Sequence, residues 1–238
     1  MEPNTQEGDI DLFTREKQSN LAYEKIKNRK AIVVGCGGVG SVLSTILAEG
    51  GICDMSLIDM DEFSYADNRQ LYSTERNQGK NKAIATAHGV AERTMCYVKP
   101  YAGNAIEFFK DGGITSAECD VFLCVDSTDA RKEVYKAMLE RTPRDMIGKI
   151  LDVGVERNTI QVLNYRTKTP SDVYKDDGQA HCTTIPLSSF RAFMAASLMA
   201  SAYYSLFETE GTEDEPLVPY DHALQVYTNT MTKFLRKI

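Results

Sequence analysis

The sequence predicts a doubly wound α/β fold of the Rossmann-like type, in which a mostly parallel sheet ends in an antiparallel extension. Short apolar runs alternate with longer segments of helical spacing, and this order builds a parallel sheet. A glycine-rich turn at residues 35–40 joins the first run to the first helical segment. Two later runs, residues 147–153 and 159–165, are joined by a tight turn, which favours an antiparallel pair.

The expected elements follow one another along the chain. Strands are predicted where short, mostly apolar runs lie between turn residues. These runs are residues 30–36, 54–59, 120–125, 147–153, 159–165 and, as the last strand, 223–228. Helices are predicted where apolar residues recur at helical spacing, at residues 39–49, 80–96, 128–141 and 188–209. A polar stretch from Arg166 to about residue 185 has neither pattern, and a loop of that length is usually functional or disordered.

Length and composition restrict the class of protein. The chain has 238 residues, 42% of them hydrophobic and 26% charged, which suits one large α/β domain. The net charge of −7 argues against nucleic acid, which requires a basic face. No apolar run approaches the roughly 20 residues of a membrane span, and the polar residues 1–11 contain no signal-peptide core. We therefore expect a cytoplasmic protein that binds neither nucleic acid nor membrane.

The cysteines give no sign of a zinc site, because no two of them form a C-x-x-C pair. Most lie in or beside apolar stretches, where cysteine usually acts as a small buried hydrophobic residue. We expect free thiols in a reducing compartment. The six are Cys36, Cys53, Cys96, Cys119, Cys124 and Cys182.

The glycine-rich turn is the expected nucleotide site. Its glycines let the backbone approach a phosphate, and the helix that follows offers free N–H groups and a positive dipole end. Asp59 and Asp61 end the second strand, where a carboxylate can accept hydrogen bonds from ribose hydroxyls. These residues alone fit NAD or FAD as well as ATP.

Charged residues further along the chain favour ATP. Arg69 and Lys82 would neutralise a triphosphate while pyrophosphate leaves, whereas a dinucleotide needs no such cations. Asp129 follows a buried strand, at the edge of the sheet where such folds place ligands. Its carboxylate oxygens are suitable ligands for Mg²⁺. We therefore expect ATP and Mg²⁺ as cofactors.

Together these motifs resemble those of the family that contains the ubiquitin-activating enzymes and the sulfur-carrier adenylyltransferases ThiF and MoeB. The family pattern is a G-x-G-G-x-G loop, a D-x-D strand end, N-x-x-R-Q, G-x-x-K and a C-T-D-N-like strand end. The resemblance runs from about Arg15 to the last predicted strand. The matching segments are residues 35–40, Asp59-Met60-Asp61, Asn68-Arg69-Gln70, residues 79–82 and Ser127-Thr128-Asp129.

The resemblance implies a ThiF/MoeB-like fold and a role for each matching residue. Arg15 looks like the family's N-terminal arginine, which reaches into the partner subunit's site, so a homodimer is implied. Residues 1–29 would form an N-terminal arm and helix, and residues 30–238 an adenylation domain with a crossover loop at 166–187. The residues implied at the cofactor are Gly35, Gly37, Gly38, Gly40, Asp59, Asp61, Asn68 and Gln70. Those implied in catalysis are Arg15, Arg69, Lys82 and Cys182, with Asp129 at the Mg²⁺ ion.

The sequence also departs from the family pattern. The spacing from Asp61 to Arg69 is one residue short, so either Asp67 or Asn68 could take the role of the family's asparagine. Ala130 replaces the asparagine that usually follows the metal-binding aspartate. The C-x-x-C pairs of many members are absent. We therefore expect a compact, zinc-free member.

Cys182 lies in the polar stretch, in a context similar to the C-T-x-x-x-P of the thioester cysteine in eukaryotic activating enzymes. Pro186 comes one place early, so the match is partial. A thiolate is a suitable nucleophile for an acyl-adenylate, and the alternative is a cysteine with no catalytic role.

Two related activities and two unrelated ones are open. The first is adenylation of the C-terminal glycine of a ubiquitin-like protein, then a thioester on Cys182, with a conjugating enzyme as a possible further partner. The second is a sulfur-carrier adenylyltransferase that stops at the acyl-adenylate. An NAD-dependent oxidoreductase would leave Arg69, Lys82 and Asp129 unexplained. A non-catalytic half of a heterodimer would not need the full set of ATP residues.

Overall fold

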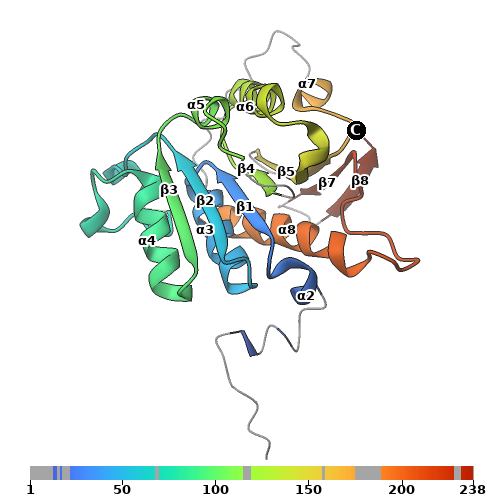
Figure 1. Cartoon of the computed structure of the whole chain (residues 1–238), viewed down its shortest axis with the longest axis horizontal. Helices are drawn as coiled ribbons and strands as arrows, with labels where there is room; N and C mark the ends of the chain where they lie inside the picture. Colours follow the sequence, from blue (N-terminus) through green and yellow to red (C-terminus); the bar gives the residue numbers. More distant parts are fainter. Residues whose placement is uncertain are drawn as a thin grey trace, which may run out of the picture.

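A computed structural model describes residues 13–14, 17, 22–67, 70–114, 119–156, 159–174, 189–227 and 232–237. These residues form one eight-stranded sheet in the order β3-β2-β1-β4-β5-β6-β7-β8 (Figure 1). Strands β3 to β5 pair in parallel, and the pairs from β5 to β8 are antiparallel. The predicted doubly wound sheet with an antiparallel extension is therefore confirmed.

The bounds of the elements agree with most of the predicted ones to within a few residues. The strands are β1 (Lys30–Val34), β2 (Asp54–Asp59), β3 (Tyr97–Ala102), β4 (Cys119–Leu123), β5 (Ile147–Val155), β6 (Thr159–Tyr165), β7 (His222–Tyr227) and β8 (Thr232–Lys237). The α-helices are α2 (Tyr23–Ile26), α3 (Gly38–Glu49), α4 (Lys82–Thr94), α5 (Ala105–Lys110), α6 (Thr128–Arg141), α7 (Pro170–Val173) and α8 (Ser189–Glu208). Short 3₁₀ turns lie at η1 (Tyr65–Asp67), η2 (Glu75–Asn77) and η3 (Arg144–Met146).

Both edge strands were missed by the sequence prediction. Strand β3 contains Pro100 and has mostly exposed side chains, which an edge strand tolerates because one side of it has no ladder to complete. The prediction that residues 223–228 form the last strand is wrong, because β8 pairs with β7 beyond them. Strand β8 carries exposed Lys233, Arg236 and Lys237, which hide its pattern and protect a free edge from pairing with other chains.

The core lies on both faces of the sheet. Helices α3, α4 and α8 cover one face, and α5 and α6 cover the other (Figure 1). Strand β1 is apolar after Lys30 because both of its faces are buried. Ala31 and Val33 face the core under α3, α4 and α8, and Ile32 and Val34 face the core under α5 and α6. In the part of the chain described here, no helix has both the length and the apolarity needed to cross a membrane.

The order of the strands determines where a ligand can bind. Strand β2 lies on one side of β1 and β4 lies on the other. Helix α3 follows β1 onto one face, whereas α6 follows β4 onto the opposite face. Open α/β sheets bind ligands outside the carboxyl ends of the strands at such a switch point. The expected site is therefore the edge where β1, β2 and β4 end.

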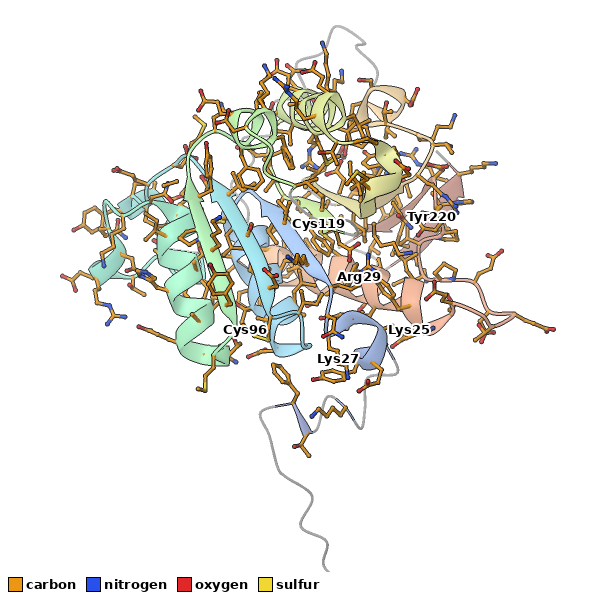
Figure 2. All side chains as sticks on the ribbon, in the orientation of Figure 1. Lys25, Lys27, Arg29, Cys96, Cys119 and Tyr220 are labelled. Carbon is orange, nitrogen blue, oxygen red and sulfur yellow. A yellow bond between two sulfur atoms is a disulfide. The ribbon has the colours of Figure 1, made fainter. Side chains whose placement is uncertain are left out.

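A disulfide joins Cys53 to Cys96 at the amino ends of β2 and β3, away from the expected site (Figure 2). The prediction of free thiols is therefore wrong for this pair. Each cysteine precedes a strand, and the parallel register sets Asp54 opposite Tyr97, so the two Cα atoms lie 4.4 Å apart. The sequence could not reveal this proximity, because it depends on β3. Cys36, Cys119 and Cys124 are free, and Cys182 lies outside the described residues.

Candidate nucleotide-binding site

The turn between β1 and α3 is tight on its inner side. Gly35 has φ +91°, and a Cβ there would lie 2.8 Å from the carbonyl oxygen of Cys124. A Cβ on Gly40 would lie 1.8 Å from the carbonyl oxygen of Gly35. Side chains at these two positions would collide with backbone, so both glycines are required by the turn itself.

The same turn is open where a phosphate would approach. Gly37 is the N-cap of α3, and Gly38 is the first residue of that helix. A Cβ added to Gly37 would meet no atom of the described residues within 4 Å. The first N–H groups of a helix have no partner inside the helix, so this end of α3 provides donors beside open space.

Asp59, the last residue of β2, holds the turn from the neighbouring strand. One carboxylate oxygen accepts a hydrogen bond from the Cys36 N–H at 2.6 Å, and the other accepts one from the Asp61 N–H at 2.8 Å. Burial raises the pKa of Asp59, and these two hydrogen bonds oppose that rise. Each carboxylate oxygen can accept a further hydrogen bond, so Asp59 can support the turn and also bind ribose.

Lys82 places a buried cation beside the end of β2. It is the first residue of α4, and 11% of its side chain is exposed. Its Nζ lies 3.6 Å from an Asp61 oxygen and 3.4 Å from an Asp67 oxygen. Asn81 caps α4 and donates from Nδ2 to the carbonyl oxygens of Asp59 and Asp61, which fixes the start of the helix against β2.

Asp67 is part of the same charged group. Burial raises its pKa, but hydrogen bonds from the N–H and hydroxyl of Ser64 and the charge of Lys82 outweigh burial, so the pKa lies below its usual value. Asp67 is therefore ionised and paired with Lys82. Asn68, the other candidate for the role of the family's asparagine, lies outside the described residues.

Gln70 carries a buried acceptor close to Asp67. Its Nε2 donates to an Asp67 oxygen at 2.8 Å. Its Oε1 is buried and has no hydrogen-bond partner among the described residues. A buried acceptor without a donor is costly, so a donor from a ligand, such as a ribose hydroxyl or an amino group, fits there.

The turn from β4 to α6 brings two carboxylates to the same edge. Ser127 caps α6, and its hydroxyl accepts from the Ala130 N–H at 3.3 Å. Asp129, the predicted metal ligand, is exposed in the first turn of the helix. Asp126 lies immediately before the cap, closer in sequence to the end of β4, and it is not among the metal ligands predicted from the sequence. Its position directly after a buried strand was the available signal.

The carboxylates at the turn between β4 and α6 fit a Mg²⁺ ion that binds together with a nucleotide. Among the described side chains, no three His, Cys, Asp or Glu residues gather into a metal site. Mg²⁺ at nucleotide sites usually takes one or two protein carboxylates, with phosphate oxygens and waters as its other ligands. Asp126 and Asp129 are single carboxylates of this kind.

Most of the predicted site residues lie at one edge of the sheet. Those gathered at the carboxyl ends of β1, β2 and β4 are Gly35, Gly37, Gly38, Gly40, Asp59, Asp61, Gln70, Lys82 and Asp129. Those outside the described residues are Arg15, Asn68, Arg69 and Cys182, and their roles stay predictions.

A doubly wound sheet with an open glycine turn and a buried lysine at its switch point has the features of a nucleotide-binding α/β protein. The ThiF family matches the chain over residues 10–236, and the chain belongs to this family.

The chain is also similar to longer curated proteins. It is 31% identical over 156 residues to ubiquitin-like modifier-activating enzyme 5 of Dictyostelium discoideum, which covers 58% of this chain and 38% of that protein. For the protein of the same name in Drosophila persimilis, the identity is 29% over 151 residues, covering 56% and 38%. The chain thus spans about two fifths of the length of these relatives.

Solved structures share the fold. Escherichia coli MccB with AMPCPP and MccA superimposes with a TM-score of 0.70 at 21% identity, covering 91% of this chain and 66% of that one. PaaA gives a TM-score of 0.69 at 16% identity, covering 92% and 66%. The expected ThiF/MoeB-like fold is therefore confirmed.

Proposed function

We propose that this chain is an ATP-dependent adenylyltransferase that activates the C-terminal glycine of a ubiquitin-like protein. The observation that carries the proposal is the buried Lys82 beside the open glycine turn, because a dinucleotide site has no need of a buried lysine there. Membership of the ThiF family supports it, as do the relatives named ubiquitin-like modifier-activating enzyme 5 and the MccB structures solved with ATP or AMPCPP.

In the proposed reaction the nucleotide phosphates lie over Gly37 and Gly38, and the ribose lies near Asp59 and Gln70. A carboxylate oxygen of the substrate forms a bond to the α-phosphorus of ATP. The bond from that phosphorus to the bridging oxygen breaks, and pyrophosphate leaves with the electron pair. Lys82 stabilises the negative charge that develops on the phosphate oxygens. Mg²⁺, held by Asp126 or Asp129, would neutralise further phosphate charge.

The remaining parts of the proposal concern residues outside the described ranges. Arg69 would be a second cation at the phosphates, and Arg15 would complete the site of the second subunit in a cytoplasmic homodimer. The Cys182 thiolate would then attack the carbonyl of the acyl-adenylate, forming a thioester and releasing AMP. A conjugating enzyme could receive the product. A sulfur-carrier protein is the alternative substrate, and with it no thioester forms on Cys182.

Two neighbouring lysines provide a matched test of the adenylation step. Lys82→Ala should reduce ATP–pyrophosphate exchange by about 10² or more, because a preorganised cation is lost from the transition state. Lys80→Ala, at an exposed position two residues earlier, should leave exchange unchanged. Exchange is measured with labelled pyrophosphate, MgCl₂ and candidate ubiquitin-like proteins that end in glycine. Equal activity of both variants, or binding of NAD in preference to ATP, would contradict the proposal.

A further inference from the structure

Two buried Arg–Asp–Tyr clusters lie at opposite ends of the central strands. The amino-end cluster consists of Asp120 on β4, Arg29 and Tyr203, and Figure 2 shows Arg29 between α2 and β1. The carboxyl-end cluster consists of Asp152 on β5, Arg131 on α6, Tyr165 and Tyr174. Only the second lies at the edge of the sheet that holds the nucleotide site.

The carboxyl-end cluster is built around one buried carboxylate. One oxygen of Asp152 pairs with the Arg131 guanidinium. The other accepts hydrogen bonds from the hydroxyls of Tyr165 at 3.0 Å and Tyr174 at 3.1 Å. Burial raises the pKa of both tyrosines, so both remain protonated donors. The Arg131 guanidinium also lies 5.8 Å from the centre of the Tyr174 ring.

Arg131 connects this carboxylate to the turn between β4 and α6. Besides its pairing with Asp152, the guanidinium donates to the carbonyl oxygen of Val125. That carbonyl belongs to the residue immediately before Asp126. On the other side, Asp152 is held in register with Leu123, the last residue of β4. The cluster therefore links β5, at the level where β4 ends, to the backbone next to a candidate metal ligand.

Stability alone does not explain such a cluster. Burying an ion pair costs much of the electrostatic free energy that the pair returns, and apolar replacements are often as stable. The pair does, however, define one position for the Val125 carbonyl and hence for the turn. Asp152 also compensates the charge of Arg131, which would otherwise repel a cation bound at the same edge.

We propose that the carboxyl-end cluster is a positioning element that sets the β4–α6 turn for binding of Mg²⁺ with ATP. Arg131, Asp152 and Tyr174 are then positioning residues that act through Asp126 and its neighbours. This inference rests on the proposed ATP-dependent function and names the part of the protein that determines its magnesium dependence.

The amino-end cluster provides the matched control. Tyr174→Phe and Tyr203→Phe each remove one phenol hydrogen bond to a buried aspartate. The bond that Tyr203→Phe removes is 2.6 Å long and lies at the end of the sheet away from the nucleotide site. ATP binding to the full chain is measured by calorimetry over a series of MgCl₂ concentrations, together with thermal unfolding. The measured quantity is the Mg²⁺ concentration at which half of the Mg²⁺-dependent gain in ATP affinity is reached. We expect Tyr174→Phe to raise this concentration about three- to tenfold, as loss of one hydrogen bond to a charged group allows.

Tyr203→Phe should lower the unfolding temperature to a similar extent without changing the magnesium dependence. Asp152→Asn should shift that dependence in the same direction as Tyr174→Phe, and Tyr174→Phe alone decides the matter if Asp152→Asn does not fold. A magnesium dependence that is unchanged in Tyr174→Phe, or shifted equally in Tyr203→Phe, overturns the inference. Wild-type protein that binds ATP equally with and without Mg²⁺ also overturns it, while leaving the nucleotide site in place. Absence of ATP binding overturns the proposed function as well.

Discussion

Gly37→Ala should mainly weaken ATP binding and Gly40→Ala should mainly lower stability, although the two residues lie in the same turn. A methyl group on Gly40 would lie 1.8 Å from the carbonyl oxygen of Gly35, so the backbone of the turn has to move. Overpacking of this kind costs about 1–3 kcal/mol. In a chain of this size each kcal/mol lowers the unfolding temperature by about 2–4 °C.

The methyl group of Gly37→Ala meets no atom within 4 Å in the described part of the chain, so the free energy of unfolding should change by less than about 0.5 kcal/mol. The same methyl group would occupy the space through which a phosphate approaches the start of α3. Loss of one hydrogen bond to a charged phosphate costs about 1.5–3 kcal/mol, which is roughly a 10- to 150-fold increase in Kd for ATP.

Calorimetric titration with ATP and MgCl₂, combined with thermal unfolding followed by circular dichroism, separates the two effects. Gly37→Ala should unfold at the wild-type temperature and bind ATP weakly, whereas Gly40→Ala should unfold several degrees lower. Wild-type ATP affinity in Gly37→Ala would show that the phosphates do not lie over this glycine. The proposed pose of the nucleotide would then be wrong.

Three further predictions test other parts of the molecule. The Cys53–Cys96 disulfide joins residues with a sequence separation of 43, so its reduction should lower the free energy of unfolding by up to about 4 kcal/mol. Equal unfolding temperatures with and without dithiothreitol would contradict this. Burial of Asp221 is outweighed by hydrogen bonds from Thr167 and from nearby backbone N–H groups, which lower its pKa from 3.8 to about 2. The stability that these bonds provide should be complete above about pH 4 and lost as the pH falls toward 2, and acid unfolding of Asp221→Asn should lack this loss. Cys182→Ala should retain pyrophosphate exchange but form no reductant-sensitive adduct with its substrate, whereas a sulfur-carrier adenylyltransferase would form none even as wild type.

The central part of the fold could be predicted because its signals are local. Strand β2, helix α6 and strand β6 have the bounds that the sequence indicates, because both strands contain aliphatic residues that are buried in the core and Ser127 marks the start of α6. The edge strands β3 and β8 could not be predicted, because their side chains are mostly exposed and their order comes from pairing with β2 and β7. The disulfide depends on that same pairing.

Much of the candidate site was predictable for similar reasons. The parts that depend on partners distant in the chain were not predicted. The glycine turn, Asp59 and Lys82 follow local motifs. Arg131 and Asp152 are 21 positions apart and belong to different elements. A charged residue is usually exposed, so nothing in the sequence indicates that these two are buried together. Only the register of β4 with β5 brings them to the site.

The contacts of Asp59 change how mutations at this edge should be interpreted. Its carboxylate already accepts hydrogen bonds from the N–H groups of Cys36 and Asp61, so it supports the glycine turn through contacts within the protein. Asp59→Ala would leave the Cys36 donor unpaired and disturb the turn, so weaker ATP binding in that variant would not demonstrate contact with ribose.

Gln70 gives the better probe, because its Oε1 has no hydrogen-bond partner among the described residues. In Gln70→Glu the oxygen facing the ligand is kept while the Nε2 donor to Asp67 is lost. In Gln70→Leu both are lost. Weaker ATP binding in Gln70→Leu than in Gln70→Glu, despite the added negative charge of the glutamate, would therefore assign the Oε1 acceptor to the nucleotide, whereas wild-type ATP affinity in Gln70→Leu would show that the nucleotide does not use it.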